Sequence, residues 1–418
     1  MALDTIKKPL RVVHTSDWHI GRALYGRKRY DEHEHFLCWL AEYIEGHGVD
    51  VLLVAGDVFD NTTPSNRAQE LYYRFLCRVA DSACGHVVVT AGNHDSPTFL
   101  DAPRSVLRHL NVHVVGQAAA RPEDEVLALR DAAGAVRLIV CAVPYLRERD
   151  LRLSEAGETR EEKDRKLIAG IHDHYRQACD AAVRLRDRCD ASPPIIAMGH
   201  LFAAGGTVSE GDGVREIYIG SLARVGVDAF PACIDYLALG HLHASQCVGG
   251  NETRRYSGAP LPMSFGEARQ TKTVLSVEFD NATPRCVPVP VPCFQALEQI
   301  TGALDVIGAR LDALKAGGES VWLEIVYEGD AIPGELRAEL DARVADSALE
   351  ILRVKNNRIT GTAVMSDAAS EALSALDVHE VFRRCLEAHD VPADQRPDLT
   401  DAYRELVVAC AESDARAE

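Results

Sequence analysis

The stretch Val51-Leu52-Leu53-Val54-Ala55-Gly56-Asp57 joins five apolar residues to a glycine and a carboxylate. A short apolar run that ends at a turn residue is typical of a buried strand. The pattern recurs, because polar motifs also follow other apolar runs of strand length. These motifs are Asp17-Trp18-His19, Gly92-Asn93-His94-Asp95, Gly199-His200 and Gly240-His241-Leu242-His243. In open α/β sheets the loops beyond the carboxyl ends of strands converge on one crevice, so we expect these polar side chains to meet there.

Apolar runs alternate with helical patterns through the region that carries the motifs, which indicates an α/β layered domain. The predicted strands are Leu10–His14, Val51–Ala55, Val87–Thr90, Leu138–Val143, Ile195–Met198 and Tyr236–Leu239. The predicted helices are Glu32–Ile44, Arg67–Val79 and Thr159–Cys189, the last of them charged and mostly exposed.

A Pro-rich stretch, Pro284–Pro292, divides the chain. Its prolines exclude a helix or a central strand, so we expect a domain boundary there. The predicted organisation is a first domain over 1–283, a small α+β domain over 294–360 and a C-terminal helical segment over 366–418. The small domain should contain, in order, a strand at Ala296–Ile300, a helix at Ala303–Leu314, a strand at Val321–Tyr327, a helix at Gly334–Val344 and a strand at Leu349–Lys355.

The tail shows two short apolar stripes at helical spacing, joined by the polar loop around Pro392–Pro397. Two amphipathic helices of this kind either pack on the body of the protein or bind a partner, and the sequence leaves both interpretations open.

Length and composition limit the class of protein to which the chain can belong. The chain has 418 residues, of which 47% are hydrophobic, ample for several packed domains. No run reaches the roughly 20 apolar residues that span a bilayer, and the 12 cysteines include no Cys-x-x-Cys pair, so we expect a cytoplasmic protein with buried thiols.

A net charge of −18 argues weakly against a protein that wraps nucleic acid. One loop is nevertheless basic, with Arg22, Arg27, Lys28 and Arg29, and it is either simply solvated or in contact with DNA.

The motif residues are carboxylates, an amide oxygen and imidazoles, a ligand set that suits Mn²⁺, Fe²⁺ or Zn²⁺. A pair of such ions can hold the attacking and the leaving oxygen of a phosphate ester, so the motifs predict a two-metal phosphoesterase site. Asp57 is expected to bridge the ions, because two close cations repel unless an anion lies between them. Asp17, His19 and His243 are expected to serve the first ion, and Asn93, His200 and His241 the second.

His94 directly follows the Asn93 ligand and is expected to face the substrate, where it is a candidate acid for the leaving oxygen. Asp95 has two candidate roles. Its carboxylate either orients the His94 ring or caps a helix that starts around Ser96-Pro97.

At these motifs the chain resembles the calcineurin-type metallophosphoesterase superfamily. The resemblance rests on the blocks Ser16-Asp17-Trp18-His19-Ile20-Gly21, Ala55-Gly56-Asp57-Val58-Phe59-Asp60, Ala91-Gly92-Asn93-His94-Asp95-Ser96 and Leu239-Gly240-His241-Leu242-His243. More narrowly, the chain resembles the family of SbcD nuclease subunits of bacterial SbcC/SbcD complexes. That likeness rests on the order of domains and on Ile219-Gly220-Ser221-Leu222, Tyr256-Ser257-Gly258-Ala259-Pro260 and Ser264-Phe265-Gly266-Glu267.

The resemblance implies a layered αββα sandwich with a small capping domain that contacts DNA. It implies a Mn²⁺-dependent double-strand exonuclease and single-strand endonuclease that acts in DNA repair, recombination and replication. Matching positions assign Asp17, His19, Asp57 and His243 to one ion, Asp57, Asn93, His200 and His241 to the other, and His94 to the transition-state histidine.

The resemblance also implies partners: an SbcC-type ATPase held by the tail helices, and a second copy of the chain bound through helices near Arg67–Val79 and Ser96–Leu110. One position departs from archaeal and eukaryotic relatives, which often carry a strand-guiding histidine where this chain has Asp60. That role is therefore not carried over.

Two other functions are compatible with the motifs. A phosphatase or phosphodiesterase for nucleotides or other small phosphate esters could use the same metal core. A non-catalytic DNA-end tether is the second, although a scaffold has no need for several histidines directed at one metal pair.

Overall fold

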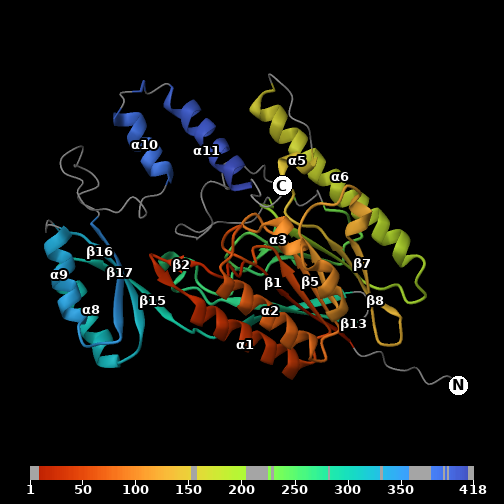
Figure 1. Ribbon diagram of the computed structural model, residues 1–418, viewed down its shortest axis with the longest axis horizontal. Coiled ribbons are helices and arrows are strands. Elements are labelled where there is room, and N and C mark those ends of the chain that lie inside the picture. The colour runs from red at the N-terminus through yellow and green to blue at the C-terminus, as the bar shows by residue number, and fades with distance from the viewer. Residues whose placement is uncertain are drawn as a thin grey trace.

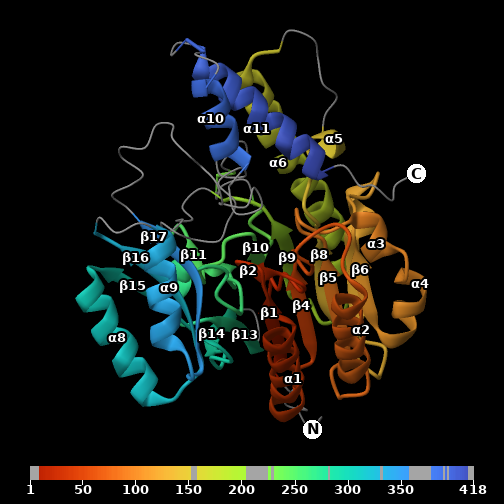
Figure 2. The same ribbon diagram turned by 60° about the vertical axis from the view of Figure 1, so that its left-hand side comes forward.

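The computed structural model describes residues 9–151, 158–203, 225–226, 230–280, 283–329, 333–356, 378–388, 391–392 and 395–412. Two six-stranded mixed sheets pack face to face, and helices cover their outer faces (Figures 1 and 2). The first sheet has the order β14 (Thr283–Pro290), β13 (Thr273–Asp280), β1 (Leu10–Thr15), β4 (Val51–Ala55), β5 (His86–Thr90) and β6 (Val112–Val115). The second has the order β11 (Gln246–Val248), β12 (Asn251–Tyr256), β10 (Tyr236–Gly240), β9 (Ile195–His200), β8 (Val136–Ala142) and β7 (Val126–Arg130). This is the αββα sandwich that the resemblance implies.

The helices form the outer layers. Helices α1 (Tyr30–His47) and α2 (Asn66–Ala80) pack on the first sheet, and α6 (Arg160–Arg186) packs on the second. The shorter helices are α3 (Pro97–Asp101), α4 (Arg104–Leu107), η1 (Arg108–Leu110), η2 (Pro122–Glu125), α5 (Glu148–Leu151) and η4 (Phe265–Glu267). A small hairpin, β2 (Ala23–Leu24) with β3 (Arg27–Lys28), follows β1.

Strand β4 shows why the apolar run is continuous. Leu52 and Val54 face the helices α1 and α2, whereas Leu53 and Ala55 face the second sheet. Successive side chains of a strand point to opposite faces, so a strand buried on both faces needs apolar residues at every position.

The six predicted strands are all present, as β1, β4, β5, β8, β9 and β10. The sequence patterns do not indicate how these strands divide between two sheets, nor do they indicate β6, β7, β11, β12 and β13. These missed strands lie toward the edges of the sheets.

Helix α6 corrects one expectation. It is not mostly exposed, because Ile171, Tyr175, Ala178 and Ala182 are buried against the second sheet. These residues recur every three or four positions and so form one apolar face on an otherwise charged helix.

The Pro-rich stretch forms neither a helix nor a central strand, as its prolines predict. Residues 283–290 form β14, an antiparallel edge strand paired with β13, so the first sheet extends past residue 283. Pro284, Pro288 and Pro290 stand at alternate positions, which lets their missing N–H groups all lie on the unpaired side of the edge strand.

The small C-terminal sheet is parallel, in the order β15 (Ala296–Gly302), β16 (Val321–Tyr327) and β17 (Leu349–Asn356). Helices α8 (Leu304–Gly317) and α9 (Pro333–Val344) connect the strands and cover one face of the sheet. On its other face Trp322 packs with Leu24 and Phe265, so the small sheet rests on the β2–β3 hairpin and on η4.

The tail contains α10 (Val378–Ala388) and α11 (Arg396–Glu412), which lie side by side in both views (Figures 1 and 2). The rings of Phe382 and Tyr403 stack between them, with centroids 4.0 Å apart. Among the described residues, no helix is long and apolar enough to cross a membrane. The block at 219–222 lies outside the described residues.

Candidate metal centre

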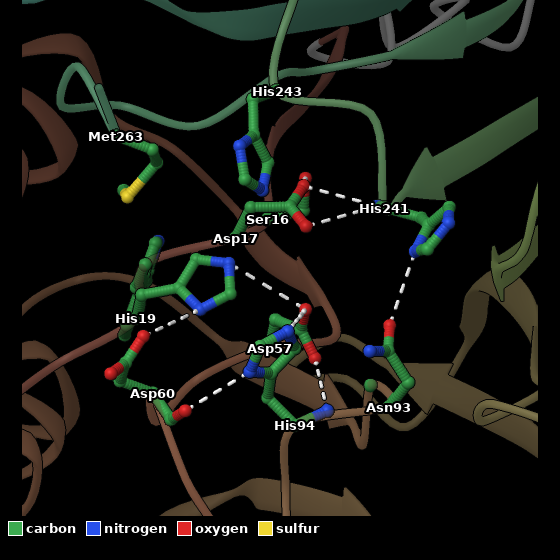
Figure 3. Close-up of polar contacts among 12 residues, drawn as sticks. Ser16, Asp17, His19, Asp57, Asp60, Asn93, His94, His241, His243 and Met263 are labelled. Carbon is green, nitrogen blue, oxygen red and sulfur yellow. Dashed lines mark hydrogen bonds and ion pairs between the residues drawn. The ribbon is translucent and has the colours of Figure 1, made fainter. Parts of the chain in front are cut away.

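The polar motifs meet where strands of both sheets end. Asp17 follows β1, Asp57 follows β4, Asn93 follows β5, His200 is the last residue of β9 and His241 follows β10. Figure 3 shows the side chains of several of these residues directed toward one another. The structure thus brings together all seven predicted ligands, although from two sheets rather than from one.

The backbone at the site is strained. Asp17, His19, Asp57 and His241 adopt the left-handed region, with φ values of 53°, 47°, 52° and 104°. Non-glycine residues in such regions cost on the order of 1–3 kcal/mol each and are common at functional sites. Gly56 has a φ of 84°, and a Cβ there would collide with the His200 ring. The strained turns bring the carboxylates and imidazoles into close contact.

The residues predicted to bind the second ion, Asn93, His200 and His241, form a group that we call the second cluster. It centres on the side-chain oxygen of Asn93. Asn93 Oδ1 lies 2.9 Å from His200 Nε2 and 3.1 Å from His241 Nδ1. His200 Nδ1 lies 2.9 Å from the Ala55 carbonyl and donates to it, which directs Nε2 toward Asn93. Three potential ligand atoms therefore converge on one point.

The first cluster contains Asp17, His19 and His243, whose ligand atoms all lie within 4.8 Å of one another. Asp57 joins the two clusters, because its Oδ2 lies 3.6 Å from His19 Nε2 and 3.3 Å from His200 Nε2. Asp57 is thus placed where a bridging carboxylate would stand.

The protonation of two of the histidines fits cation binding. Burial lowers the pKa of His19 and of His241, which favours the neutral imidazole that a metal needs. The Nε2 atom of His19 lacks a hydrogen-bond partner among the described residues. Burial raises the pKa of Asp17, whose carboxylate would be compensated by a bound cation.

Asp57 and His200 form a charge pair inside the site. Burial opposes the charge of both groups, but their attraction outweighs it, lowering the pKa of Asp57 and raising the pKa of His200 to about 9. A bound cation would replace the His200 proton, and the buried carboxylates and imidazoles are a donor set that is consistent with two divalent ions.

His94 is fixed beside the two clusters. Its backbone N–H donates to Asp57 Oδ1 over 2.8 Å, and its Nδ1 lies 3.0 Å from the Asp60 carbonyl oxygen (Figure 3). A carbonyl can only accept, so Nδ1 carries the proton of a neutral ring. Nε2 then faces Asp57 Oδ2 at 4.0 Å.

Asp95 plays neither of the roles expected for it. Its carboxylate accepts hydrogen bonds from the backbone N–H groups of Val58, Phe59 and Gly92, at 3.1, 2.9 and 2.8 Å. The helix cap is Ser96, whose Oγ accepts from the N–H of Phe99. Burial, with the Asp57 carboxylate, raises the pKa of Asp95 to about 7. Asp95 ties the loop after β4 to the loop after β5.

Two carboxylates behind the site, those of Asp60 and Glu267, were not predicted as site residues from the sequence. Asp60 Oδ1 lies 3.5 Å from His19 Nδ1, and Glu267 Oε1 lies 3.5 Å from His243 Nδ1. Burial alone would raise the pKa of both carboxylates. The His19 ring and Arg22 hold the pKa of Asp60 well below its usual range. The His243 ring and Lys272 hold the pKa of Glu267 well below its usual range. The spacing of Asp60 three residues after Asp57 was the one available signal, whereas Glu267 follows no predicted strand.

The basic loop is only partly a solvated surface. Arg29 is buried, pairs with Glu32 at 2.8 Å and donates to the Pro262 carbonyl. Arg22 Nη1 lies 3.1 Å from Asp60 Oδ1. Arg22 therefore contacts a carboxylate beside the site and Arg29 is buried in the fold, while Arg27 and Lys28 are exposed.

Known proteins are similar to this sequence over most of its length. The family described as calcineurin-like phosphoesterase matches residues 10–245, and the family described as type 5 capsule protein repressor C-terminal domain matches residues 293–390. The SbcD subunit of the SbcCD nuclease of Escherichia coli K12 is 38% identical over 397 residues, which cover 94% of this chain and 97% of that protein.

The corresponding SbcD proteins of two further bacteria are also similar. That of Rhodobacter capsulatus is 38% identical over 369 residues, covering 84% of this chain and 87% of that protein. That of Bacillus subtilis is 35% identical over 275 residues, covering 64% of this chain and 66% of that protein.

Proposed function

Since the chain belongs to the calcineurin-like phosphoesterases and, within them, to the SbcD nuclease subunits, we propose that it cleaves DNA phosphodiesters at the two clusters with Mn²⁺ as its cofactor. The observation that carries this proposal is the position of Asp57, whose Oδ2 lies within 3.6 Å of a histidine of each cluster. A bridging carboxylate is what a pair of close cations requires.

In this proposal each cluster holds one ion. Asp17, His19 and His243 would hold the first, Asn93, His200 and His241 would hold the second, and Asp57 would serve both. Two bound divalent ions would lower the pKa of a water and stabilise the attacking and leaving oxygens.

His94 then acts on the leaving group. Because Nδ1 is held by the Asp60 carbonyl, Nε2 is the ring atom that faces the reacting phosphate. Water adds to phosphorus and loses a proton to solvent, the bond to the leaving oxygen breaks, and protonated His94 gives that oxygen its proton from Nε2. In-line attack of this kind needs no covalent enzyme intermediate.

The substrates and setting follow the family. We propose double-strand exonuclease and single-strand endonuclease activity in DNA end processing, repair, recombination and replication, in the nucleoid region of the cytoplasm where that DNA lies. The domain limits at 1–283, 294–360 and 366–418 remain predictions, now with β14 assigned to the first sheet.

The proposed partners are an SbcC-type ATPase and a second copy of the chain. Leu399 and Leu406 on α11 are 40% and 61% exposed, which supports a docking role for the tail helices. Val106 on α4 is 65% exposed and Leu110 is 37% exposed, close to the face through which the dimer would form.

A phosphatase for nucleotides or other small phosphate esters is the alternative that the same clusters permit. It needs neither the small domain seated on η4 nor the paired tail helices.

The test is a cleavage assay with the purified full-length chain, Mn²⁺ and an end-labelled DNA duplex, with and without the ATPase partner, beside a small phosphate ester. We expect DNA cleavage that EDTA abolishes. Turnover of the small ester with intact DNA under all conditions would overturn the nuclease and favour the phosphatase.

A further inference from the structure

The histidines of the two clusters differ in what lies behind their rings. In the first cluster, His19 Nδ1 faces Asp60 Oδ1 and His243 Nδ1 faces Glu267 Oε1, each at 3.5 Å (Figure 3 for Asp60). In the second cluster, His200 Nδ1 faces the neutral Ala55 carbonyl. Both imidazoles of the first cluster thus have an anionic partner.

The Asp60 carboxylate is fixed from the side of the basic loop. Its Oδ1 also contacts Arg22 Nη1 at 3.1 Å, and Arg22 Nη2 reaches the Met263 carbonyl at 3.4 Å. The main chain of Asp60 holds His94 as well, so one residue supports both a first-cluster ligand and the candidate acid.

The Glu267 carboxylate is fixed from the other side. Glu267 is fully buried, its Oε2 accepts from the Met263 N–H over 3.0 Å, and it pairs with Lys272. Lys272 Nζ also donates to the His243 carbonyl over 3.2 Å. Arginine and lysine therefore balance the charge of the two carboxylates without displacing them from the rings.

A carboxylate behind a metal-binding imidazole has a known physical effect. It holds the proton on the far ring nitrogen, turns the near nitrogen toward the ion and makes that nitrogen a stronger donor, and its loss typically weakens metal binding by about 10–100-fold. The 3.5 Å separations are slightly longer than ordinary hydrogen bonds, and a small tilt of either ring would bring them to hydrogen-bond distance.

We propose that Asp60 and Glu267 are positioning residues that make the cluster of Asp17, His19 and His243 the tighter of the two ion sites, so that this site fills first. The proposal rests on the two-ion function above and adds an order of loading to it. Behind His200 of the second cluster stands a neutral carbonyl in place of a carboxylate.

The test is calorimetric titration of Mn²⁺ into the metal-free full-length chain and into Asp60→Asn and Glu267→Gln, which keep side-chain size. For the unmodified chain we expect two binding events of different affinity. Each variant should weaken the tighter event about 10–100-fold and change the weaker one by less than about threefold.

The matched control is Glu278→Gln, which removes a carboxylate paired with Arg11 at 3.3 Å on β13, at the opposite end of β1 from Asp17. It should leave both events unchanged. Thermal unfolding of the metal-free variants separates lost ligand positioning from lost folding.

Equal weakening of both events in folded Asp60→Asn, or no weakening in either variant, would overturn the inference while leaving the two-ion function intact. A single Mn²⁺ event, or none, in the unmodified chain would overturn the two-ion function and the order of loading with it.

Discussion

At the residue scale, His94 is held in one orientation by two groups on the Asp57 loop. Asp57 Oδ1 accepts from its backbone and the Asp60 carbonyl accepts from its ring. We predict that His94→Gln lowers kcat by about 10²–10⁴-fold, because the acid is lost while the ligands stay in place. Mn²⁺ affinity, measured by titration, should change little. A kcat close to that of the unmodified chain would show that His94 does not protonate the leaving oxygen.

Asp95 is a structural residue of the site. Its carboxylate satisfies three N–H groups in two loops, and each buried donor left without a partner costs about 1–3 kcal/mol. We predict that Asp95→Ala lowers the free energy of unfolding by at least about 3 kcal/mol in urea denaturation. Asp95→Asn keeps one acceptor oxygen and should lose less. Equal stability of Asp95→Ala and the unmodified chain would contradict this role.

The predicted ligands could be recognised at this scale because each belongs to a short polar motif that follows an apolar run. Asp60 and Glu267 could not, since their importance depends on contacts with His19 and His243 that only the folded chain creates. The role of Asp95 was missed for the same reason, because its partners lie up to 37 positions away in the sequence.

At the element scale, β1 carries a buried histidine. Burial lowers the pKa of His14 to about 3, whereas an unfolded histidine titrates near 6.5. Between these values the unfolded chain takes up a proton that the folded chain does not. The free energy of unfolding therefore falls as the pH is lowered from about 6.5, by roughly 1.4 kcal/mol per pH unit from this residue.

His14→Gln should remove that contribution. We predict that, as the pH is lowered from 6.5 to 5, the free energy of unfolding falls by about 2 kcal/mol less in the variant than in the unmodified chain. Urea denaturation of both metal-free proteins at pH 7, 6 and 5 measures this difference. Identical pH dependence in the two proteins would mean that His14 can be protonated inside the fold.

The small sheet depends on one aromatic contact. Trp322 packs with Leu24 and Phe265, and the Arg27 guanidinium lies 5.8 Å from its ring centroid. We predict that Trp322→Ala lowers the free energy of unfolding by about 3–5 kcal/mol, measured by circular dichroism. Val306→Ala, at a half-exposed position of α8, is the control and should change it by less than about 0.5 kcal/mol. A loss below about 1 kcal/mol for Trp322→Ala would show that this contact does not hold the small sheet in place.

Elements could be predicted better than their pairing. Continuous apolar runs such as Val51–Ala55 mark strands buried on both faces, but they do not say which sheet a strand joins. Edge strands were missed because they alternate or contain proline, as in β14, and their partners are set by tertiary contacts.

At the scale of the whole molecule, the sequence predicted the layers, the small domain and the tail helices. It did not predict that the small sheet rests on the hairpin and on η4, the short helix that also carries Glu267. That contact joins residues some 300 positions apart in the chain, such as Leu24 and Trp322, which no local pattern reports.

The central claim is that one site, assembled from the ends of two sheets, holds two ions across Asp57. Anomalous diffraction from crystals of the Mn²⁺-loaded chain tests it most directly. We predict two manganese peaks about 3.5–4 Å apart on either side of the Asp57 carboxylate, one beside His19 and His243 and the other beside His200 and His241. A single peak, or two peaks that do not share Asp57, would contradict the account.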